Sequence, residues 1–164
     1  MNKVQLYVKP IEDNAIFGYT WGEIYFKIGE KYFPSINWTD FISRVLSMWS
    51  NEIIELLQGK NDILLMFMDG PYAIHISFKS ENTIYLSFRN RDEEVIHNTV
   101  DLHQFLQHII MVIDIFLKNS IERMPAFQKL YDFSQMKEAV AVARKKTSTL
   151  AHTSTSTGDG LREP

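Results

Sequence analysis

The stretch ILLMFMDGPYAIHISFKSENTIYLSF, residues Ile63–Phe88, contains three short apolar runs separated by two turn signals. The runs are Ile63–Met68, Tyr72–Phe78 and Thr83–Phe88, with Asp69-Gly70-Pro71 and Lys79–Asn82 between them. Runs of this length, rich in β-branched and aromatic residues and punctuated by Gly, Pro and Asn, are typical of adjacent antiparallel strands. The stretch therefore predicts a three-stranded meander around which the rest of the chain folds.

The first run differs from the other two because both of its faces are apolar. The second and third runs alternate apolar with polar or small residues, which indicates one buried face and one face that is solvated or only partly covered. The first run is apolar at every position from Ile63 to Met68. Such a pattern favours a strand that is central in its sheet, or one whose second face is covered by something other than water.

Residues 1–38 also have a strand pattern. Val4, Leu6 and Val8 alternate with polar residues, a polar turn is expected at Glu12–Asn14, and a second alternating run extends from Phe17 to Ile28. Gly29-Glu30 is placed to form a two-residue hairpin turn, because glycine supplies the positive φ angle that such turns need. With the meander and a further short strand at Val95–Val100, these runs predict an antiparallel sheet of about five or six strands.

The first long helix is predicted over Asp40–Gln58. Its apolar residues recur at helical spacing on either side of Trp49, and Asn37 or Thr39 can cap its N-terminus, with Asp40 in the first turn. The apolar stripe predicts that this helix packs on the sheet through Trp49.

The second long helix is predicted over Asp101–Asn119. Asp101 and Gln104 form an Asp-x-x-Gln version of the capping box. The helix should lie on the same face of the sheet as the first, with contacts through Phe105 and Phe116. A third, shorter helix with a weaker apolar stripe is predicted from about Ser134 to Lys146.

The composition favours one α+β domain over residues 1–146. The chain has 164 residues, of which 45% are hydrophobic and 13% aromatic, enough for a single core. Residues 147–164 are rich in Ser and Thr and have no apolar period, so we expect a disordered tail there. The composition of this tail would also fit an expression remnant.

Several classes of protein are disfavoured by composition. The chain has no cysteine, which removes disulfides and thiolate metal sites and fits a reducing cytoplasm. The N-terminus has no long apolar segment typical of a signal peptide, and no apolar run reaches the roughly 18–20 residues needed to span a bilayer. The net charge of −3 argues against nonspecific nucleic-acid binding. We therefore expect a cytoplasmic protein with no membrane or direct nucleic-acid contact.

The sequence has no recognisable catalytic or cofactor-binding motif. It has no Gly-x-Ser-x-Gly, Walker-type loop or Gly-x-Gly-x-x-Gly. A helical zinc pair needs histidines three or four residues apart, whereas His103 and His108 are five apart and lie on different helix faces. His75 is expected on the polar face of a strand. We therefore expect no enzymatic activity, no cofactor and no metal.

Two acidic groups remain as candidate partner-binding residues. Glu52 and Glu55 lie on one face of the first predicted helix, and Asp92, Glu93 and Glu94 lie in a predicted charged loop over Arg89–Glu94. Acidic groups of this kind are most often simply solvated. Their functional interpretation is a surface that complements a basic partner. The sequence leaves both interpretations open.

Four segments together carry a resemblance to a known family. They are GYTWGEIYFKIGEKYFPSINW, FISRVLSMWSNEIIELL, LLMFMDGPYAIHISF and DLHQFLQHIIMVIDIFL. Over about residues 1–146 the chain resembles WapI-type immunity proteins, the small cytoplasmic partners of the wall-associated polymorphic toxin WapA of Gram-positive bacteria. The resemblance implies a non-enzymatic inhibitor that binds the C-terminal nuclease domain of a contact-dependent toxin, a domain that attacks tRNA. The mild acidity of the chain fits this role, because a domain that cuts tRNA needs a basic surface.

A small-ligand or regulatory module is the alternative. An antiparallel sheet backed by two long helices can enclose a pocket between sheet and helices. The expected lining residues are Tyr19, Trp21, Tyr25 and Tyr85. Immunity requires an exposed charged or aromatic patch, whereas a ligand module requires an internal cavity.

Overall fold

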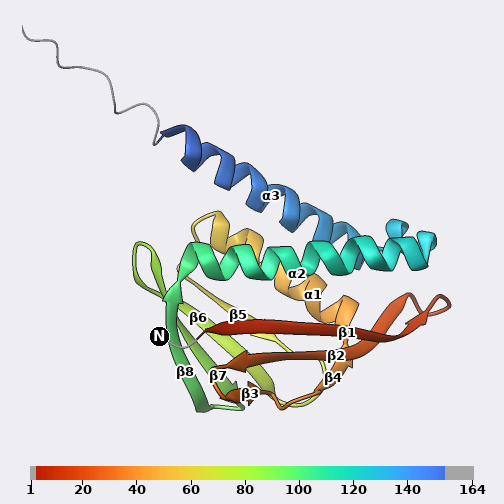
Figure 1. Ribbon diagram of the computed structural model, residues 1–164, viewed down its shortest axis with the longest axis horizontal. Coiled ribbons are helices and arrows are strands. Elements are labelled where there is room, and N and C mark those ends of the chain that lie inside the picture. The colour runs from red at the N-terminus through yellow and green to blue at the C-terminus, as the bar shows by residue number, and fades with distance from the viewer. Residues whose placement is uncertain (1–2, 154–164) are drawn as a thin grey trace, which may run out of the picture.

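The structure, a computed structural model, describes residues 3–153 as an α+β protein in which two antiparallel sheets pack against helices (Figure 1). Sheet A contains β1 (Val4–Asn14), β2 (Tyr19–Ile28), β3 (Lys31–Phe33) and β4 (Thr39–Phe41). Sheet B contains β5 (Asp62–Met66), β6 (Tyr72–Ser80), β7 (Thr83–Asn90) and β8 (Glu93–Asp101). The helices are α1 (Ile42–Leu57), α2 (Leu102–Arg123) and α3 (Tyr131–Thr153), and a 3₁₀ turn, η1, spans Pro125–Lys129.

Sheet B contains the predicted meander, in the strand order β5-β6-β7-β8. The three expected strands and the short fourth strand are confirmed, because each pairs antiparallel with its neighbour in the chain. The charged segment between β7 and β8 was expected to be a loop from Arg89 to Glu94, and this prediction was wrong. Arg89 pairs with Glu94 and Asn90 pairs with Glu93, so only a tight two-residue turn lies between the strands.

The prediction that the first strand of the meander is central or doubly covered was also wrong. β5 is an edge strand, and Leu64 and Met66 on its outer face are 41% and 51% exposed. Helix α1 covers the edge rather than the face of this strand. The indole Nε1 of Trp49 donates to the Met66 carbonyl at 2.8 Å, and the Glu52 carboxylate accepts from the Leu64 N–H at 3.4 Å. Capping an edge strand in this way blocks its pairing with another chain.

Sheet A is built around β2, which pairs with β1, β3 and β4. The Gly29-Glu30 hairpin is confirmed, with Ile28 opposite Lys31. The turn expected at Glu12–Asn14 is not there, because β1 continues through these residues to Asn14. A β-bulge between Pro10 and Glu12 lets the strand continue, and Gly22 lies opposite it. A Cβ atom at Gly22 would lie 2.3 Å from the Lys9 carbonyl oxygen, so this close approach requires glycine.

The inner faces of the two sheets meet in one aromatic core. Phe88 of sheet B contacts Phe26 and Phe33 of sheet A, with ring centroids 5.8 and 5.2 Å apart. Trp49 of α1 is fully buried, stacks on Phe26 at 5.6 Å and meets the edge of Phe67 at 5.3 Å. The predicted burial of Trp49 is therefore confirmed, and this side chain joins both sheets to α1.

The helix ends differ from the predicted ends in instructive ways. α1 begins at Ile42, without a side-chain cap, because Thr39–Phe41 forms β4 instead. The cap of α2 is confirmed, since the Asp101 carboxylate accepts from the Gln104 N–H at 2.9 Å. α3 begins before Ser134 and continues through Thr153, so it includes the first part of the predicted tail. The rest of that tail, 154–164, lies outside the described residues.

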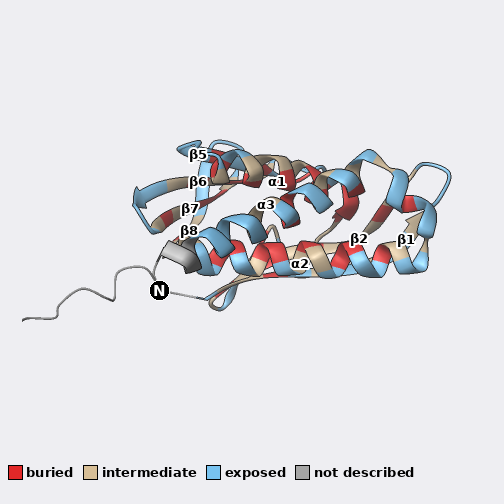
Figure 2. Cartoon of the chain, turned by 90° about the horizontal axis from the view of Figure 1, so that it is seen from above, coloured by how far each residue is buried: buried red, intermediate tan, exposed pale blue. Residues whose placement is uncertain are grey.

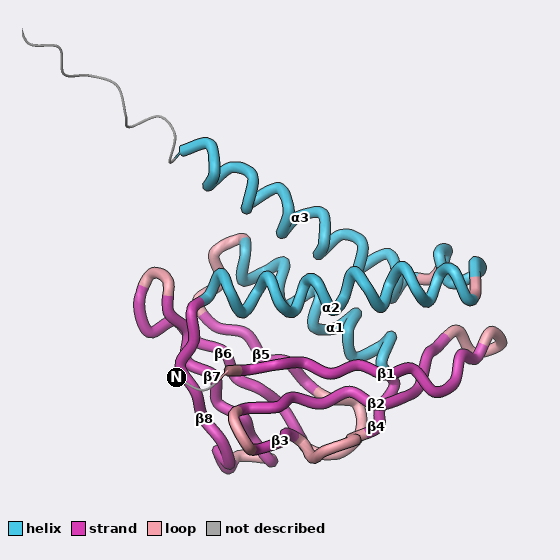
Figure 3. The backbone as a smooth tube through the Cα atoms, viewed as in Figure 1, coloured by secondary structure: helices cyan, strands magenta, loops and turns pink. Residues whose placement is uncertain are grey.

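The helices form two layers above the sheets (Figures 2 and 3). α1 contacts β2 and β5, α2 contacts β1 and β8, and α3 packs on α1 and α2. Phe116 of α2 stacks on Phe133 of α3 at 6.2 Å, so it packs on another helix where the sequence predicted the sheet. The outer face of each sheet is the face turned away from the core that the two sheets share.

Candidate functional site

Aromatic side chains gather on the outer face of sheet A. Alternation along β2 places Ile24, Phe26 and Ile28 in the core, so the residues between them point outward. Pairing then aligns Tyr7 of β1 with Tyr25, and Phe41 of β4 with Trp21. We call this surface the tyrosine face, and it comprises Tyr7, Tyr19, Trp21, Tyr25, Tyr32 and Phe41.

The rings of the tyrosine face contact one another in two groups. Tyr25 lies between Tyr7, stacked at 5.3 Å, and Tyr32, inclined at 6.0 Å, and the ammonium group of Lys27 lies 6.0 Å from the Tyr32 ring centroid. Tyr19 meets Phe41 edge-on at 5.1 Å. These contacts hold the rings in position before any partner arrives, which lowers the entropy cost of binding.

The phenol group of Tyr25 remains a hydrogen-bond donor at neutral pH. Burial, followed by the negative charge of Glu23, raises the pKa of Tyr25 above its usual value. Tyrosine and tryptophan combine a large apolar ring with a polar edge, and both are enriched among the residues that dominate protein–protein affinity. The tyrosine face is therefore suited to bind a protein surface.

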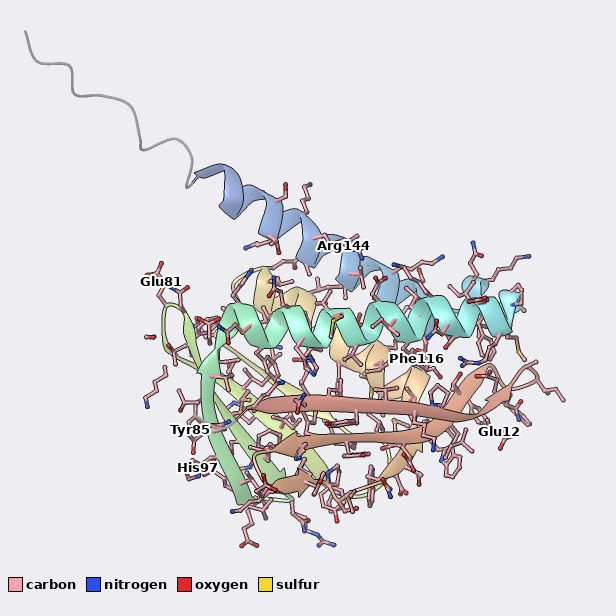
Figure 4. The ribbon with its side chains drawn as sticks, in the orientation of Figure 1. Glu12, Glu81, Tyr85, His97, Phe116 and Arg144 are labelled. Carbon is pink, nitrogen blue, oxygen red and sulfur yellow. The ribbon has the colours of Figure 1, made fainter. Side chains whose placement is uncertain are left out.

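The outer face of sheet B has a different character. The Tyr85 hydroxyl donates to the Glu94 carboxylate at 2.9 and 3.0 Å, and His97 lies 3.3 Å from the same carboxylate (Figure 4). The Ser87 hydroxyl first, and then Tyr85, hold the pKa of Glu94 below its usual range. Glu94 is thus engaged by neighbours on its own sheet.

The predicted acidic residues lie in two separate places. Asp92, Glu93 and Glu94 lie at the β7–β8 turn, where the Arg89 guanidinium donates to the Asp92 carbonyl. Glu52 and Glu55 lie near the C-terminal end of α1, and the ammonium group of Lys60 is 3.5 Å from Glu52 and 2.7 Å from Glu55. The structure does not join these groups into one patch, because the β7–β8 turn and the end of α1 lie at opposite ends of sheet B (Figure 1).

A cavity of about 850 Å³ lies where the β6–β7 hairpin, α1, α2 and α3 meet. Leu56, Phe78, Leu106 and Ile110 are among its apolar lining residues. The expected pocket residues are elsewhere, so that part of the prediction was wrong. Tyr19, Trp21 and Tyr25 belong to the tyrosine face and Tyr85 to the outer face of sheet B, because outward residues of a strand cannot line a space on the helix side.

Two titratable side chains, the buried Asp40 and the half-buried His108, hold distant segments together. The Asp40 carboxylate accepts from the N–H groups of Phe41 at 2.7 Å and of Met68 and Asp69 at 3.0 Å each, and burial raises its pKa. His108 Nε2 accepts from the Leu6 N–H at 2.8 Å, and burial, followed by the charge of Lys3, lowers the pKa of this histidine. Both contacts tie sheet A to another part of the fold.

Sequence reasoning missed the tyrosine face as a surface, although part of its signal was present. The alternation along Phe17–Ile28 placed Tyr19, Trp21 and Tyr25 on one strand face. Pattern alone could not tell whether that face is turned to a helix or to solvent, and it gave no cross-strand register for Tyr7 or Phe41.

Neither a metal centre nor a known relative suggests a function. Within residues 3–153, no group of three or more His, Cys, Asp or Glu side chains is placed to hold a metal ion. No helix in this described range is long and apolar enough to cross a membrane. Comparison of the chain with protein-family models, curated proteins and solved structures found no match. The surfaces themselves are therefore the basis for a functional proposal.

Proposed function

We propose that this protein is a cytoplasmic immunity protein that binds and inhibits the nuclease domain of a cognate contact-dependent toxin. Two things support it: the resemblance to WapI-type immunity proteins, and one structural observation, the partly exposed tyrosine face of sheet A. It makes the protein a stoichiometric inhibitor without catalytic activity, cofactor, membrane contact or direct contact with nucleic acid.

The tyrosine face supports this function because of its residue types. Large rings that are already ordered lose little entropy when they are buried, and interfaces that contain them bind tightly for their size. In the proposed complex these rings supply most of the affinity. The acidic residues of the β7–β8 turn, Asp92 and Glu93, supply long-range attraction to a basic nuclease surface and raise the association rate.

The test uses the purified C-terminal nuclease domain of a WapA-type toxin, taken from a neighbouring gene if that gene encodes a large secreted repeat protein. Tyr7→Ser/Tyr25→Ser removes two stacked rings from the tyrosine face, and Tyr85→Ser on the outer face of sheet B is the matched control. We expect the wild type and the control to block tRNA cleavage at equimolar ratio. The double variant should bind at least about tenfold more weakly, since interface hot spots cost more than 1 kcal/mol when truncated.

Two results would contradict this proposal. If the wild type neither binds the nuclease domain nor protects tRNA, the immunity function is wrong. If the Tyr85 variant weakens binding while the double variant does not, the nuclease domain binds sheet B rather than the tyrosine face. Thermal unfolding of all three proteins shows whether the variants remain folded.

A second candidate function, a small-ligand module, is favoured by the cavity of about 850 Å³. Its volume lies in the usual range of ligand sites, and most of its lining is apolar. The probe is anilinonaphthalene sulfonate, whose fluorescence rises in apolar sites. Met111 lines the cavity and is half exposed, so Met111→Trp should narrow the space and lower the fluorescence without unfolding the chain. Equal fluorescence from both proteins would argue against a ligand site here.

A further inference from the structure

The β1–β2 hairpin ends in two large apolar side chains that nothing in the described chain covers. Ile16 is 89% exposed and Phe17 is 78% exposed. The hairpin extends beyond the N-terminal end of α1 and ends below the C-terminal end of α2 (Figures 1 and 3). Isolated apolar residues are common on protein surfaces, but two adjacent ones at the tip of a projecting hairpin form a knob.

The turn that presents this knob is internally ordered. The Asn14 carboxamide oxygen accepts from the Phe17 N–H at 2.9 Å, and the Asn14 carbonyl accepts from the Gly18 N–H at 2.8 Å. Gly18 has φ +69°, a conformation that favours glycine, and packs close to Leu130. The apolar tip is therefore held in one shape by its own turn.

The base of the hairpin is braced against the helices. The Arg123 guanidinium of α2 donates twice to the Asp13 carboxylate, at 2.7 and 3.2 Å. The Thr20 hydroxyl donates to the same carboxylate at 2.7 Å, and the Thr20 N–H donates to the hydroxyl of Ser43 at 3.0 Å. A bidentate arginine–carboxylate pair fixes orientation as well as distance. The knob is thus a rigid projection, which would lose little entropy on entering a pocket.

We propose that Ile16 and Phe17 are the anchor by which this protein enters an apolar pocket of its partner, a pocket bordered by cationic side chains. The inference rests on the proposed function and assigns the contact residues of the same complex. The anchor adjoins the tyrosine face, because Tyr19 opens β2 directly after the turn and contacts Phe41. The knob is thus next in the chain to the Tyr19–Phe41 end of the tyrosine face.

The charges around the knob favour a basic protein over a membrane. From Pro10 to Phe26 the chain contains Glu12, Asp13 and Glu23 but neither lysine nor arginine. Glu12 is exposed near the hairpin tip (Figure 4), and the nearby Arg123 is paired with Asp13. Segments that insert apolar residues at a lipid surface usually carry Lys or Arg for the anionic headgroups. The exposed Glu12 would instead complement the basic surface of a nuclease domain.

The experiment compares Ile16→Ser/Phe17→Ser with Ile115→Ser, which changes a half-exposed isoleucine on α2. The probe is the toxin nuclease domain used above, and surface plasmon resonance gives both rate constants. We expect the double variant to dissociate at least about tenfold faster, with little change in association rate, since apolar anchors act mainly on dissociation. The Ile115 variant should match the wild type, and all three should have similar melting temperatures.

Each contrary outcome has a distinct meaning. Wild-type binding with unchanged dissociation of the double variant overturns the anchor but leaves the immunity function standing. No binding by the wild type overturns both. Flotation with vesicles of equal parts phosphatidylcholine and phosphatidylglycerol, if it depends on Ile16 and Phe17, overturns the protein pocket in favour of a membrane. Sedimentation that shows oligomers of the wild type but monomers of the double variant overturns it in favour of a second copy of the chain.

Discussion

The outer faces of sheets A and B, both antiparallel, differ in how their side chains contact one another. On sheet B, several polar side chains pair with one another, as Tyr85, Glu94 and His97 do, and as His75 does with Asp62 at 2.9 Å, while Leu64 and Met66 of β5 are exposed. On sheet A, Tyr7, Tyr25 and Tyr32 contact one another through their rings. When the polar groups of a surface are already paired with one another, covering that surface with a partner adds little binding free energy. Covering an ordered aromatic surface adds more. This difference is why the proposed interface lies on sheet A.

The largest expected effect tests the core that both sheets share. Trp49→Ala should destabilise the fold by about 3–5 kcal/mol, because it empties a large site between Phe26 and Phe67 and removes the donor to the Met66 carbonyl. Trp21→Ala on the tyrosine face is the matched control and should cost less than about 1 kcal/mol. Urea unfolding measures both. Similar losses for the two variants would mean that the tyrosine face is as buried as the core.

The next effect tests how sheet A is joined to the turn that follows β5. Asp40→Ala leaves the N–H groups of Phe41, Met68 and Asp69 without their acceptor, at a cost of about 1–3 kcal/mol. Asp69→Ala changes an exposed carboxyl in the same turn and should be nearly neutral. Hydrogen exchange should show faster exchange of the Met68 and Asp69 amides in the Asp40 variant only. Unchanged exchange there would remove Asp40 as the link.

A smaller effect, dependent on pH, tests the edge of sheet A. Folding lowers the pKa of His108, so the unfolded chain binds a proton there more readily than the folded chain. The stabilisation is therefore complete above the unfolded-state pKa of about 6.5 and is lost as the pH falls below it. The loss grows with the size of this pKa shift, and protonation of Nε2 also removes the acceptor for the Leu6 N–H.

His108→Gln keeps an acceptor for the Leu6 N–H but cannot titrate, so it should flatten the stability profile between about pH 7 and pH 5. His103→Gln changes an exposed histidine on the same helix and should leave the wild-type profile in place. Urea midpoints measured across this range distinguish the variants. A profile that His108→Gln leaves unchanged would place the pH dependence in another group.

The smallest expected effect concerns the acidic turn of sheet B. Asp92→Lys/Glu93→Lys reverses two exposed charges and spares Glu94, which Tyr85 and His97 engage. In the proposed complex, association with the nuclease domain should slow several-fold at low salt, while dissociation changes little. Rates measured from about 50 to 500 mM salt should show a flatter salt dependence for the variant. Identical slopes would place the β7–β8 turn outside the interface and leave sheet A as the whole contact.

The sequence by itself determined the local elements of this protein. The meander, the Gly29-Glu30 hairpin and the Asp101 cap were predicted correctly because each depends on residues close together in the chain. The fold class and the burial of Trp49 were predicted from the spacing of apolar residues. A period of two residues indicates a strand and a period of 3.6 a helix, and in both cases the period shows which side chains lie on the same face.

Only the tertiary structure decided what each face meets. Packing of the elements determined the division into two sheets, the edge position of β5 and the position of Tyr25 on the outer face of β2. Periodicity does not show whether a helix or solvent covers a given face. The bond from Leu6 to His108 joins residues 102 positions apart, and no local pattern encodes it. The tyrosine face depends on cross-strand register, which aligns aromatic residues of different strands. The orientation of the β1–β2 hairpin depends on its contact with Arg123 of α2.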